Sequence, residues 1–280
     1  MKTAFIILTY NRPDILLPVL RGLAEQCDAR HEIIIADDGS SQAAIDAVRT
    51  GLPAFKCPVR HVWYPDTGFT ASRARNLAAA VSSADYLVFM DGDCLPNPHF
   101  VEGHAALLEP GFFVNGSRVL LSAELTQTIV DGQIDINKAS LGDWLRWRMT
   151  RDVNKLIHLI HWLNAPGRKQ EKFVWKKIRS CNFALWRKDF LRVNGFDESF
   201  EGWGHEDADL VLRLHNVGLK RKNGYCATEV YHLWHKVNSR TDESKNRKIV
   251  TQRLHSGLIR AFKGVDNGAT ADHVVVTKFN

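Results

Sequence analysis

The amino-acid sequence predicts an α/β fold in which helices flank a mostly parallel central sheet. Two observations support this prediction. Short, continuously apolar runs, of the kind that buried strands need, alternate with segments of helical periodicity over residues 1–100. The chain of 280 residues, 45% hydrophobic and 24% charged, is also long enough to bury a sizeable core. This composition excludes disordered and fibrous proteins.

Four apolar runs define the strands that we expect. They are Ala4–Leu8, Glu32–Ala36, Val59–Val62 and Tyr86–Met90. Between them, residues 15–23, 45–48 and 71–81 carry apolar or small side chains at helical spacing. Pro13 stands just before the first of these segments and suits the first turn of a helix. The order of strand and helix therefore repeats through the first hundred residues.

Polar residues directly follow three of the predicted strands. They are Thr9-Tyr10-Asn11, Asp37-Asp38 and Asp91-Gly92-Asp93. Because the carboxyl ends of parallel strands meet at one edge of a sheet, we expect these residues to converge on a ligand. The alternative is that each only caps a helix or makes a turn. No G-x-G-x-x-G follows the first strand and no G-x-x-x-x-G-K-[ST] occurs, which argues against dinucleotide dehydrogenases and P-loop enzymes.

The sharpest local signal is Asp91-Gly92-Asp93. Two carboxylates at a strand end can hold a hard divalent cation and leave its other positions to water and substrate phosphates. The pattern thus predicts a magnesium or manganese site that binds a diphosphate. The alternative is a turn with solvated aspartates.

A second dense stretch runs from Asn194 to Leu210 and contains Gly202-Trp203-Gly204-His205-Glu206-Asp207. The glycines allow a ligand to approach closely, and Trp203 offers a flat surface for stacking. Crowded carboxylates raise at least one pKa, which prepares a group for general-base work. On the helix that follows, Glu206 and Asp209 share one face and Asp207 points elsewhere, so the three have different roles. The alternative is an acidic first turn that complements the helix dipole.

Together these residues resemble those of a family 2 glycosyltransferase with the GT-A fold, whose central sheet is Rossmann-like. The resemblance covers roughly residues 1–240, and the later segment is similar to β-1,4-galactosyltransferases and bacterial chondroitin-type polymerases. Its motifs are Thr9-Tyr10-Asn11-Arg12, Asp37-Asp38-Gly39-Ser40, Arg75-Asn76, Asp91-Gly92-Asp93 and the segment from Asn194-Gly195-Phe196-Asp197 to Glu206-Asp207.

The resemblance implies an inverting transferase that takes a sugar from a nucleotide-diphosphate sugar, with a preference for uridine, and uses Mn²⁺ or Mg²⁺. It implies that Asp207 deprotonates the acceptor hydroxyl while Glu206 orients the acceptor. Asp93 would hold the metal, together with His232 or, as the other candidate, His235. The residues implied for the nucleotide-sugar pocket are Thr9, Tyr10, Asn11, Arg12, Asp37, Asp38, Arg73, Arg75, Asp91, Gly92 and Trp203.

The chemistry of sugar transfer agrees with these roles. A sugar nucleotide carries a good leaving group, so the enzyme must neutralise the departing diphosphate and activate a hydroxyl. Asp93 and Asp207 meet these two needs. His205 stands where the galactosyltransferases have glycine, so galactose is not assumed as the donor sugar.

We expect one GT-A unit in three parts. Residues 1–100 bind the nucleotide sugar, residues 101–240 bind the acceptor and carry catalysis, and residues 241–280 form a C-terminal helix and tail. Leu254–Phe262 is a short amphipathic stretch, and Gly264–Asp272 suggests a loose tail before Val274-Val275-Val276.

Residues 140–180 form a basic, tryptophan-rich insert. It holds ten Lys or Arg, three Asp or Glu and four of the eight tryptophans, and its net charge of +7 exceeds the +6 of the whole chain. Apolar residues between Leu141 and Ile160 recur at helical spacing and predict an amphipathic helix. Such a helix can pack on the sheet, lie on an anionic membrane, or bind an anionic acceptor such as a lipid-linked glycan.

The five cysteines are widely spaced without C-x-x-C, which favours a reducing compartment. No apolar run is long enough for a signal-peptide core or a membrane span, so we expect a cytoplasmic protein, with peripheral contact to the inner face of the membrane as an option.

Three other functions compete with transfer to a glycan or lipid-linked glycan in surface polysaccharide or lipopolysaccharide synthesis. A non-catalytic glycan-binding or regulatory relative is disfavoured by the intact carboxylates. A nucleotidyltransferase would carry a basic, glycine-rich loop near its first strand, and none occurs. Nucleic acid is not expected as a partner, because no recognition module accompanies the basic insert.

Overall fold

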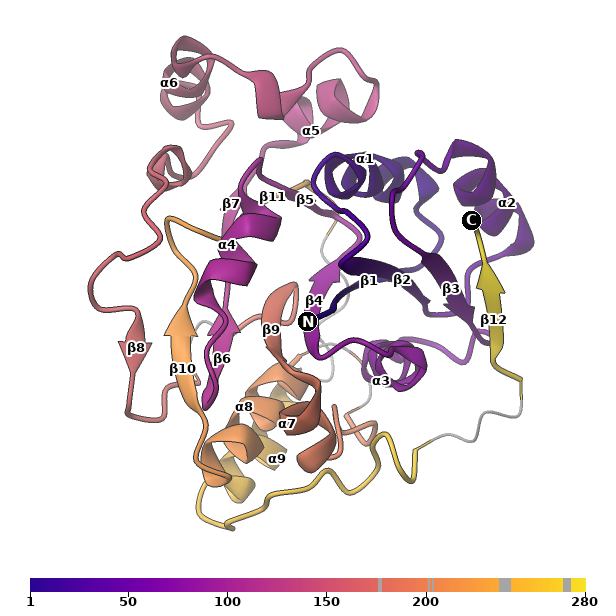
Figure 1. The fold of residues 1–280 in the computed structure, drawn as a ribbon, viewed down its shortest axis with the longest axis vertical. Helices are drawn as coiled ribbons and strands as arrows, with labels where there is room; N and C mark the ends of the chain where they lie inside the picture. The colour runs from indigo at the N-terminus through magenta and orange to yellow at the C-terminus, as the bar shows by residue number, and fades with distance from the viewer. Residues whose placement is uncertain (176–177, 201, 203, 237–242, 269–272) are drawn as a thin grey trace.

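The computed structural model describes residues 1–175, 178–200, 202, 204–236, 243–268 and 273–280. Within these ranges, one nine-stranded sheet runs in the order β12-β3-β2-β1-β4-β9-β6-β10-β8, and a three-stranded sheet runs in the order β5-β11-β7. Helices cover both faces of the large sheet (Figure 1). The predicted α/β fold with a mostly parallel central sheet is thus confirmed.

The first hundred residues fold as the apolar periodicity predicts. Their elements are β1 (Thr3–Thr9), α1 (Pro13–Ala24), β2 (His31–Asp37), α2 (Gln42–Gly51), β3 (Val59–Trp63), α3 (Ala71–Val81) and β4 (Tyr86–Asp91). Strand β1 pairs in parallel with both β2 and β4, and β2 pairs in parallel with β3. Their polar carboxyl ends therefore lie at the same edge of the sheet.

The remainder of the chain extends the sheet and adds the smaller one. Its elements are β5 (Cys94–Pro96), α4 (Phe100–Leu107), β6 (Phe112–Asn115), β7 (Ser117–Leu120), α5 (Ala123–Val130), α6 (Leu141–Met149), β8 (Lys169–Gln170), β9 (Asn182–Trp186), α7 (Arg187–Arg192), α8 (Glu206–Asn216), β10 (Lys220–Asn223), β11 (Glu229–His232), α9 (Glu243–Arg253) and β12 (Val275–Lys278). Short 3₁₀ turns occupy Ile136–Lys138 and Ile157–Leu159.

The central strands are buried on both faces, which is why their sequences are continuously apolar rather than alternating. Phe5 and Ile7 of β1 face the core that contains α1, α4 and α6. Ala4 and Ile6 point the other way, into the core that contains α3, α7 and α8. The sheet is therefore a rigid platform for the groups at its edge.

The small sheet brings the end of β11 to the Asp91-Gly92-Asp93 turn. Strand β11 pairs antiparallel with β5, in a register that sets His232 opposite Cys94. The backbone N–H of Leu233 also donates to the carbonyl oxygen of Asp93 at 2.9 Å. Residues more than 130 positions apart in the sequence thus become neighbours.

The amphipathic helix predicted over residues 141–160 is wrong in extent. Helix α6 ends at Met149, and Arg151 adopts a left-handed φ of 67° that a helix cannot contain. Val153 then bridges to Leu121, while Ser122 donates to the Asp152 carboxylate at 2.6 Å. Pairing with the segment before α5 therefore outweighs helix continuation.

The C-terminal segment also differs from the prediction. Its helix, α9, occupies residues 243–253, and the amphipathic stretch 254–262 is not helical. After the expected tail, β12 pairs antiparallel with β3 at the edge of the sheet. The Asn280 side chain accepts from the Val59 N–H at 2.7 Å and donates to the Cys57 carbonyl at 2.9 Å, so the last residues are tied down.

Among the helices in the described part of the chain, none combines the length and the apolar character that crossing a membrane requires.

Candidate active site

Asp93 and two histidines form a compact group at the carboxyl edge of the sheet. His235 Nε2 lies 3.1 Å from one Asp93 carboxylate oxygen, and His232 Nε2 lies 3.8 Å from the other. Ligand atoms of Asp93, Cys94 and His232 also lie within 4.8 Å of one another. Of the two histidine candidates that the sequence offers, the structure brings both to Asp93, and His235 is the nearer.

The charges in this group favour an ionised carboxylate. Burial by itself would raise the pKa of Asp93, but the hydrogen bond from His235 and the nearby charges of His232 and His235 outweigh it and hold the pKa below its ordinary value. The same hydrogen bond raises the pKa of His235. A carboxylate with two imidazoles is a donor set suited to a divalent transition metal.

Gly92 allows the tight turn that presents Asp91 and Asp93. Its N–H donates to the Leu8 carbonyl oxygen at 2.7 Å, and a Cβ at this position would lie 2.8 Å from the same oxygen. Any side chain here would therefore push the turn away from β1.

Arg75 connects this turn to the acidic start of α8. It lies in α3, is only 2% exposed, and donates through Nη2 to Asp91 at 2.8 Å. Its Nη1 lies 3.5 Å from Glu206 Oε1. In the structure Arg75 bridges two carboxylates, and its predicted approach to the nucleotide or its phosphates stays a prediction.

Asp207 is the second residue of the same helix, and its carboxyl has an unusually high pKa. Removal from water and, to a smaller extent, the negative charge of Glu206 raise its pKa to about 7, although the Ala208 N–H and Arg75 act in the opposite direction. A carboxylate that titrates near neutral pH can both hold and release a proton under ordinary conditions. Glu206 and Asp209, predicted to share a face, contact different partners: Glu206 meets Arg75, and Asp209 lies fully buried.

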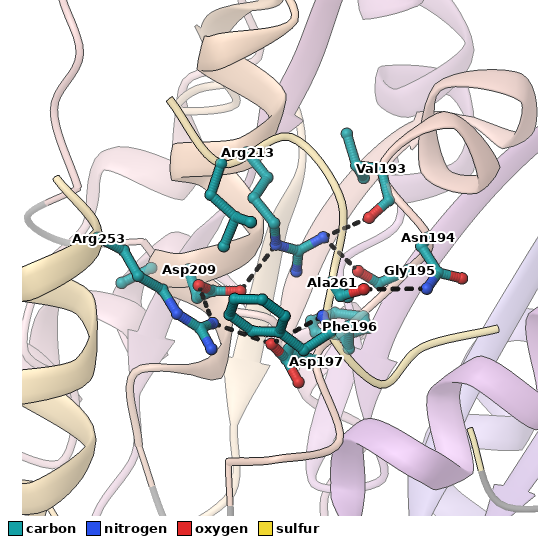
Figure 2. Close-up of polar contacts among 12 residues, drawn as sticks. Val193, Asn194, Gly195, Phe196, Asp197, Asp209, Arg213, Arg253 and Ala261 are labelled. Carbon is teal, nitrogen blue, oxygen red and sulfur yellow. Dashed lines mark hydrogen bonds and ion pairs between the residues drawn. The ribbon is translucent and has the colours of Figure 1, made fainter. Parts of the chain in front are cut away.

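A buried ionic network holds the first turn of α8 in place through Asp209 (Figure 2). Figure 2 shows Arg213 and Arg253 converging on Asp209 from two helices. Arg253 of α9 also binds Asp197 at 2.9 Å, while Arg213 Nη1 donates to the carbonyl oxygens of Val193 and Gly195 at 2.6 and 2.8 Å. The network therefore fastens α8, α9 and the segment 193–197 together.

The helix enters this turn through His205, whose φ of 72° lies in the left-handed region. Glycine tolerates that conformation without cost, whereas a residue with a Cβ pays for it. This chain therefore holds a strained histidine where glycine would be relaxed. Trp203, predicted to stack on sugar, lies outside the described residues.

The residues that directly follow β1 lie at the carboxyl edge of the sheet and are mostly exposed. Thr9 is buried, whereas Tyr10 and Arg12 are exposed. The Tyr10 hydroxyl donates to Asp66 at 2.8 Å, and Arg12 pairs with Asp14 at 2.9 Å. Asn11, with a left-handed φ of 50°, receives a bond from the Ser41 N–H at 2.9 Å.

Both aspartates after β2 are buried and already bonded. Asp37 accepts from the Ser40 N–H at 2.8 Å, and its other oxygen lies 2.8 Å from His61 Nε2. Asp38 accepts from the Thr70 N–H at 2.9 Å and from the Tyr64 hydroxyl. These bonds hold the loops that follow β2 and β3. Any contact of Asp37 or Asp38 with the nucleobase of a donor would be made in addition to them.

Tyr64 and Arg253, which the sequence analysis did not single out, also belong to this region. Arg73 stacks over the Tyr64 ring with its guanidinium carbon 4.4 Å from the centroid. Tyr64 directly follows β3, so the rule that found the other strand-end polar residues would have found it too. Arg253 has no local signal, because its carboxylate partners lie 44 and 56 positions away.

The polar face of α9 lines a hollow of about 670 Å³. Its described lining residues are Glu243, Ser244, Arg247, Lys248, Thr251 and Gln252. The charges of Glu243 and Arg247 act on the nearby imidazole of His205, whose pKa is lowered mainly by burial. The hollow therefore adjoins the start of α8.

The sequence profile of glycosyl transferase family 2 matches residues 4–193, and that of the N-terminal domain of galactosyltransferase matches residues 164–236. The chain is 29% identical over 230 residues to validoxylamine A glucosyltransferase of Streptomyces hygroscopicus subsp. jinggangensis, covering 76% of this chain and 51% of the relative. It is 24% identical over 270 residues to chondroitin synthase of Escherichia coli, covering 90% and 38%. The chain thus spans about half the length or less of these two curated relatives.

Solved structures share the fold. The TarS protein of S. aureus, residues 1–349 in complex with UDP-GlcNAc, superposes with a TM-score of 0.59 at 13% identity, covering 95% of this chain and 68% of that one. The mannosyltransferase PcManGT from Pyrobaculum calidifontis, in complex with GDP-Man and Mn²⁺, gives a TM-score of 0.56 at 15% identity, covering 94% and 65%.

Proposed function

The chain belongs to glycosyltransferase family 2, and from this premise we propose that it is an inverting, metal-dependent transferase that moves a sugar from a nucleotide-diphosphate sugar to a hydroxyl of a glycan or lipid-linked glycan. The observation that supports this most is the meeting of Asp93 with two histidines near the Glu206-Asp207 pair, joined through Asp91 and Arg75. A diphosphate leaving group and an attacking hydroxyl need these two kinds of groups close together.

The residues around Asp93 fit a divalent metal. Asp93, His232 and His235 would hold it, and their mixed oxygen and nitrogen donors suit Mn²⁺ better than Mg²⁺, which prefers oxygen ligands alone. When bound, the metal supplies positive charge that stabilises the departing diphosphate.

Asp207 is the proposed general base. Its raised pKa leaves it basic enough to accept the proton of an attacking hydroxyl near neutral pH. Glu206, held by Arg75, is proposed to orient the acceptor, and the strained turn at Gly204-His205 fixes where α8 begins.

The proposed nucleotide pocket lies over residues 1–100. Thr9, Asn11 and Gly92 shape its backbone, while Tyr10, Arg12 and Arg73 offer side chains to the nucleotide. Asp37 and Asp38 support the loops and remain the proposed neighbours of the base. We favour a uridine nucleotide, since UDP-GlcNAc is bound by the structural neighbour TarS.

Residues 101–240 are proposed to bind the acceptor, with the C-terminal part 241–280 contributing the hollow along α9. Arg247 and Lys248 line this hollow and suit an acidic or phosphorylated acceptor. The setting that we propose is the synthesis of a surface polysaccharide or lipopolysaccharide.

The proposal is tested by calorimetric titration of the protein with UDP-sugars and GDP-sugars, each in the presence of Mn²⁺ and of EDTA. We expect one donor to bind, and to bind only with metal; that donor then enters a transfer assay against glycan acceptors. Binding of a glycan without any binding of a sugar nucleotide would instead identify a non-catalytic relative.

A further inference from the structure

Helix α6 exposes an apolar stripe to solvent. Leu141, Leu145 and Met149 stand four residues apart, on one side of the helix, and are 63%, 49% and 84% exposed. A soluble helix normally turns such a stripe towards the core. In α6, other side chains pack against the core, and the stripe faces solvent.

The inward side of α6 is already filled by tryptophans. Trp144 and Trp147 are buried, and the Trp144 ring lies 5.3 Å from the ring of Tyr231 in β11. The packing of α6 on the protein is thus complete without the stripe. Tyr231 directly precedes His232, so α6 packs against the strand that carries a proposed metal ligand.

Basic residues flank the stripe. Arg146 and Arg148 lie on either side of it, and Arg151 follows the end of the helix. All three are exposed. Arg146 pairs with Asp143 at 3.1 Å, whereas within the described residues Arg148 and Arg151 have no carboxylate partner. The charge of Arg148 and Arg151 is therefore available to an anionic surface.

The apolar surface continues beyond α6. Ile157, Leu159, Ile160 and Trp162 are large, exposed hydrophobic side chains. Figure 1 shows this segment descending from α6 along the same side of the molecule towards β8. Exposed tryptophan, aliphatic side chains and arginines together are the combination that lies stably at a membrane interface.

We propose that α6 and residues 151–162 form a docking surface for an anionic lipid bilayer. The aliphatic stripe enters the interface between headgroups and acyl chains, and Arg148 and Arg151 contact lipid phosphates. Charge complementarity selects this occupant, because a second copy of this basic surface would repel it.

The proposal is tested by co-sedimentation of the full chain with vesicles of phosphatidylcholine alone and of phosphatidylcholine mixed with phosphatidylglycerol. We expect binding to the mixed vesicles, weakened by salt, and little binding to phosphatidylcholine alone. The double variant Leu145→Gln/Met149→Gln should lose at least about tenfold in vesicle affinity, and Arg148→Glu/Arg151→Glu at least about thirtyfold.

Two matched controls separate docking from general surface effects. Ile259→Gln removes a hydrophobic side chain that is exposed elsewhere, and Lys56→Glu/Lys188→Glu reverses two exposed charges elsewhere. Both should bind vesicles like the unmodified protein, and all variants should keep its melting temperature and donor affinity. Absence of binding to anionic vesicles would overturn the proposal, as would a dimer in gel filtration that Leu145→Gln/Met149→Gln disrupts.

Discussion

Arg75 of α3 and Glu206 of α8 lie 131 positions apart in the chain and meet at 3.5 Å. The other end of the same guanidinium binds Asp91 at 2.8 Å. One buried cation thus couples the turn that carries Asp93 to the helix that carries Asp207. The half of the chain proposed to bind the nucleotide and the proposed base are connected through this side chain.

We expect Arg75→Gln to lower kcat by about 100-fold while donor affinity falls much less, because Arg75 positions carboxylates and lowers the pKa of Asp207. Without this cation, the pH at which activity is half-maximal should move upward. Measurement of kcat and KM across pH checks this, with Arg49→Gln, an exposed substitution on α2, as the control. An unchanged pH profile would show that Arg75 does not act on Asp207.

Activity should depend on pH through Asp207 itself. The base works only when deprotonated, and its pKa is raised to about 7, so kcat/KM should be low at pH 5 and rise to a plateau above about pH 8. Asp207→Asn should reduce transfer at least about 1000-fold at every pH and leave donor binding nearly intact. Normal turnover by this variant would exclude Asp207 as the base.

The Asp207 carboxyl should lower the free energy of unfolding at high pH. Because its pKa is raised in the folded state, the fold is least penalised below the ordinary carboxyl pKa and loses stability as pH rises towards 7. Asp207→Asn removes that penalty and should stabilise the fold by about 2 kcal/mol at pH 8, with little effect at pH 4. Melting temperatures at the two pH values measure this, and a gain of equal size at both would contradict it.

The two histidines should both contribute to metal-dependent binding. Since His235 lies 3.1 Å from Asp93 and His232 lies 3.8 Å away on its other oxygen, replacing either by Ala should weaken Mn²⁺-dependent donor affinity by about 10- to 100-fold. His255→Ala changes an exposed histidine outside the site and serves as the control. Calorimetry with Mn²⁺ checks this; full affinity in His235→Ala would leave His232 as the histidine ligand.

The sequence predicts best those structural features that depend on residues close together in the chain. The strands of the first hundred residues are continuously apolar because both faces of the sheet are buried, and their polar ends can be read directly. The neighbourhood of His235 and Asp93 depends instead on the pairing of β11 with β5, which no local pattern specifies. The early end of α6 likewise depends on contacts of Val153 and Asp152 with residues 30 or more positions away.

The last prediction concerns Arg253, whose Nη1 lies 2.9 Å from Asp197 and 2.6 Å from Asp209. Both carboxylates are fully buried, so Arg253→Met would leave Asp197 without its cation and Asp209 with Arg213 alone. Breaking a buried ion pair typically costs about 3–5 kcal/mol, which for a chain of this size lowers the melting temperature by about 10 °C.

Arg260→Met is the matched control for Arg253→Met. It breaks the exposed ion pair with Asp266 and should cost less than about 1 kcal/mol. Because Asp209 lies in the first turn of α8, the loss of Arg253 should also lower kcat at temperatures where the variant is still folded. The double variant Arg253→Met/Asp209→Asn should lose less free energy of unfolding than the sum of the losses in the two single variants. If the effects of the two substitutions were additive, Arg253 and Asp209 would not be coupled, and α9 would not support the first turn of α8 through this ion pair.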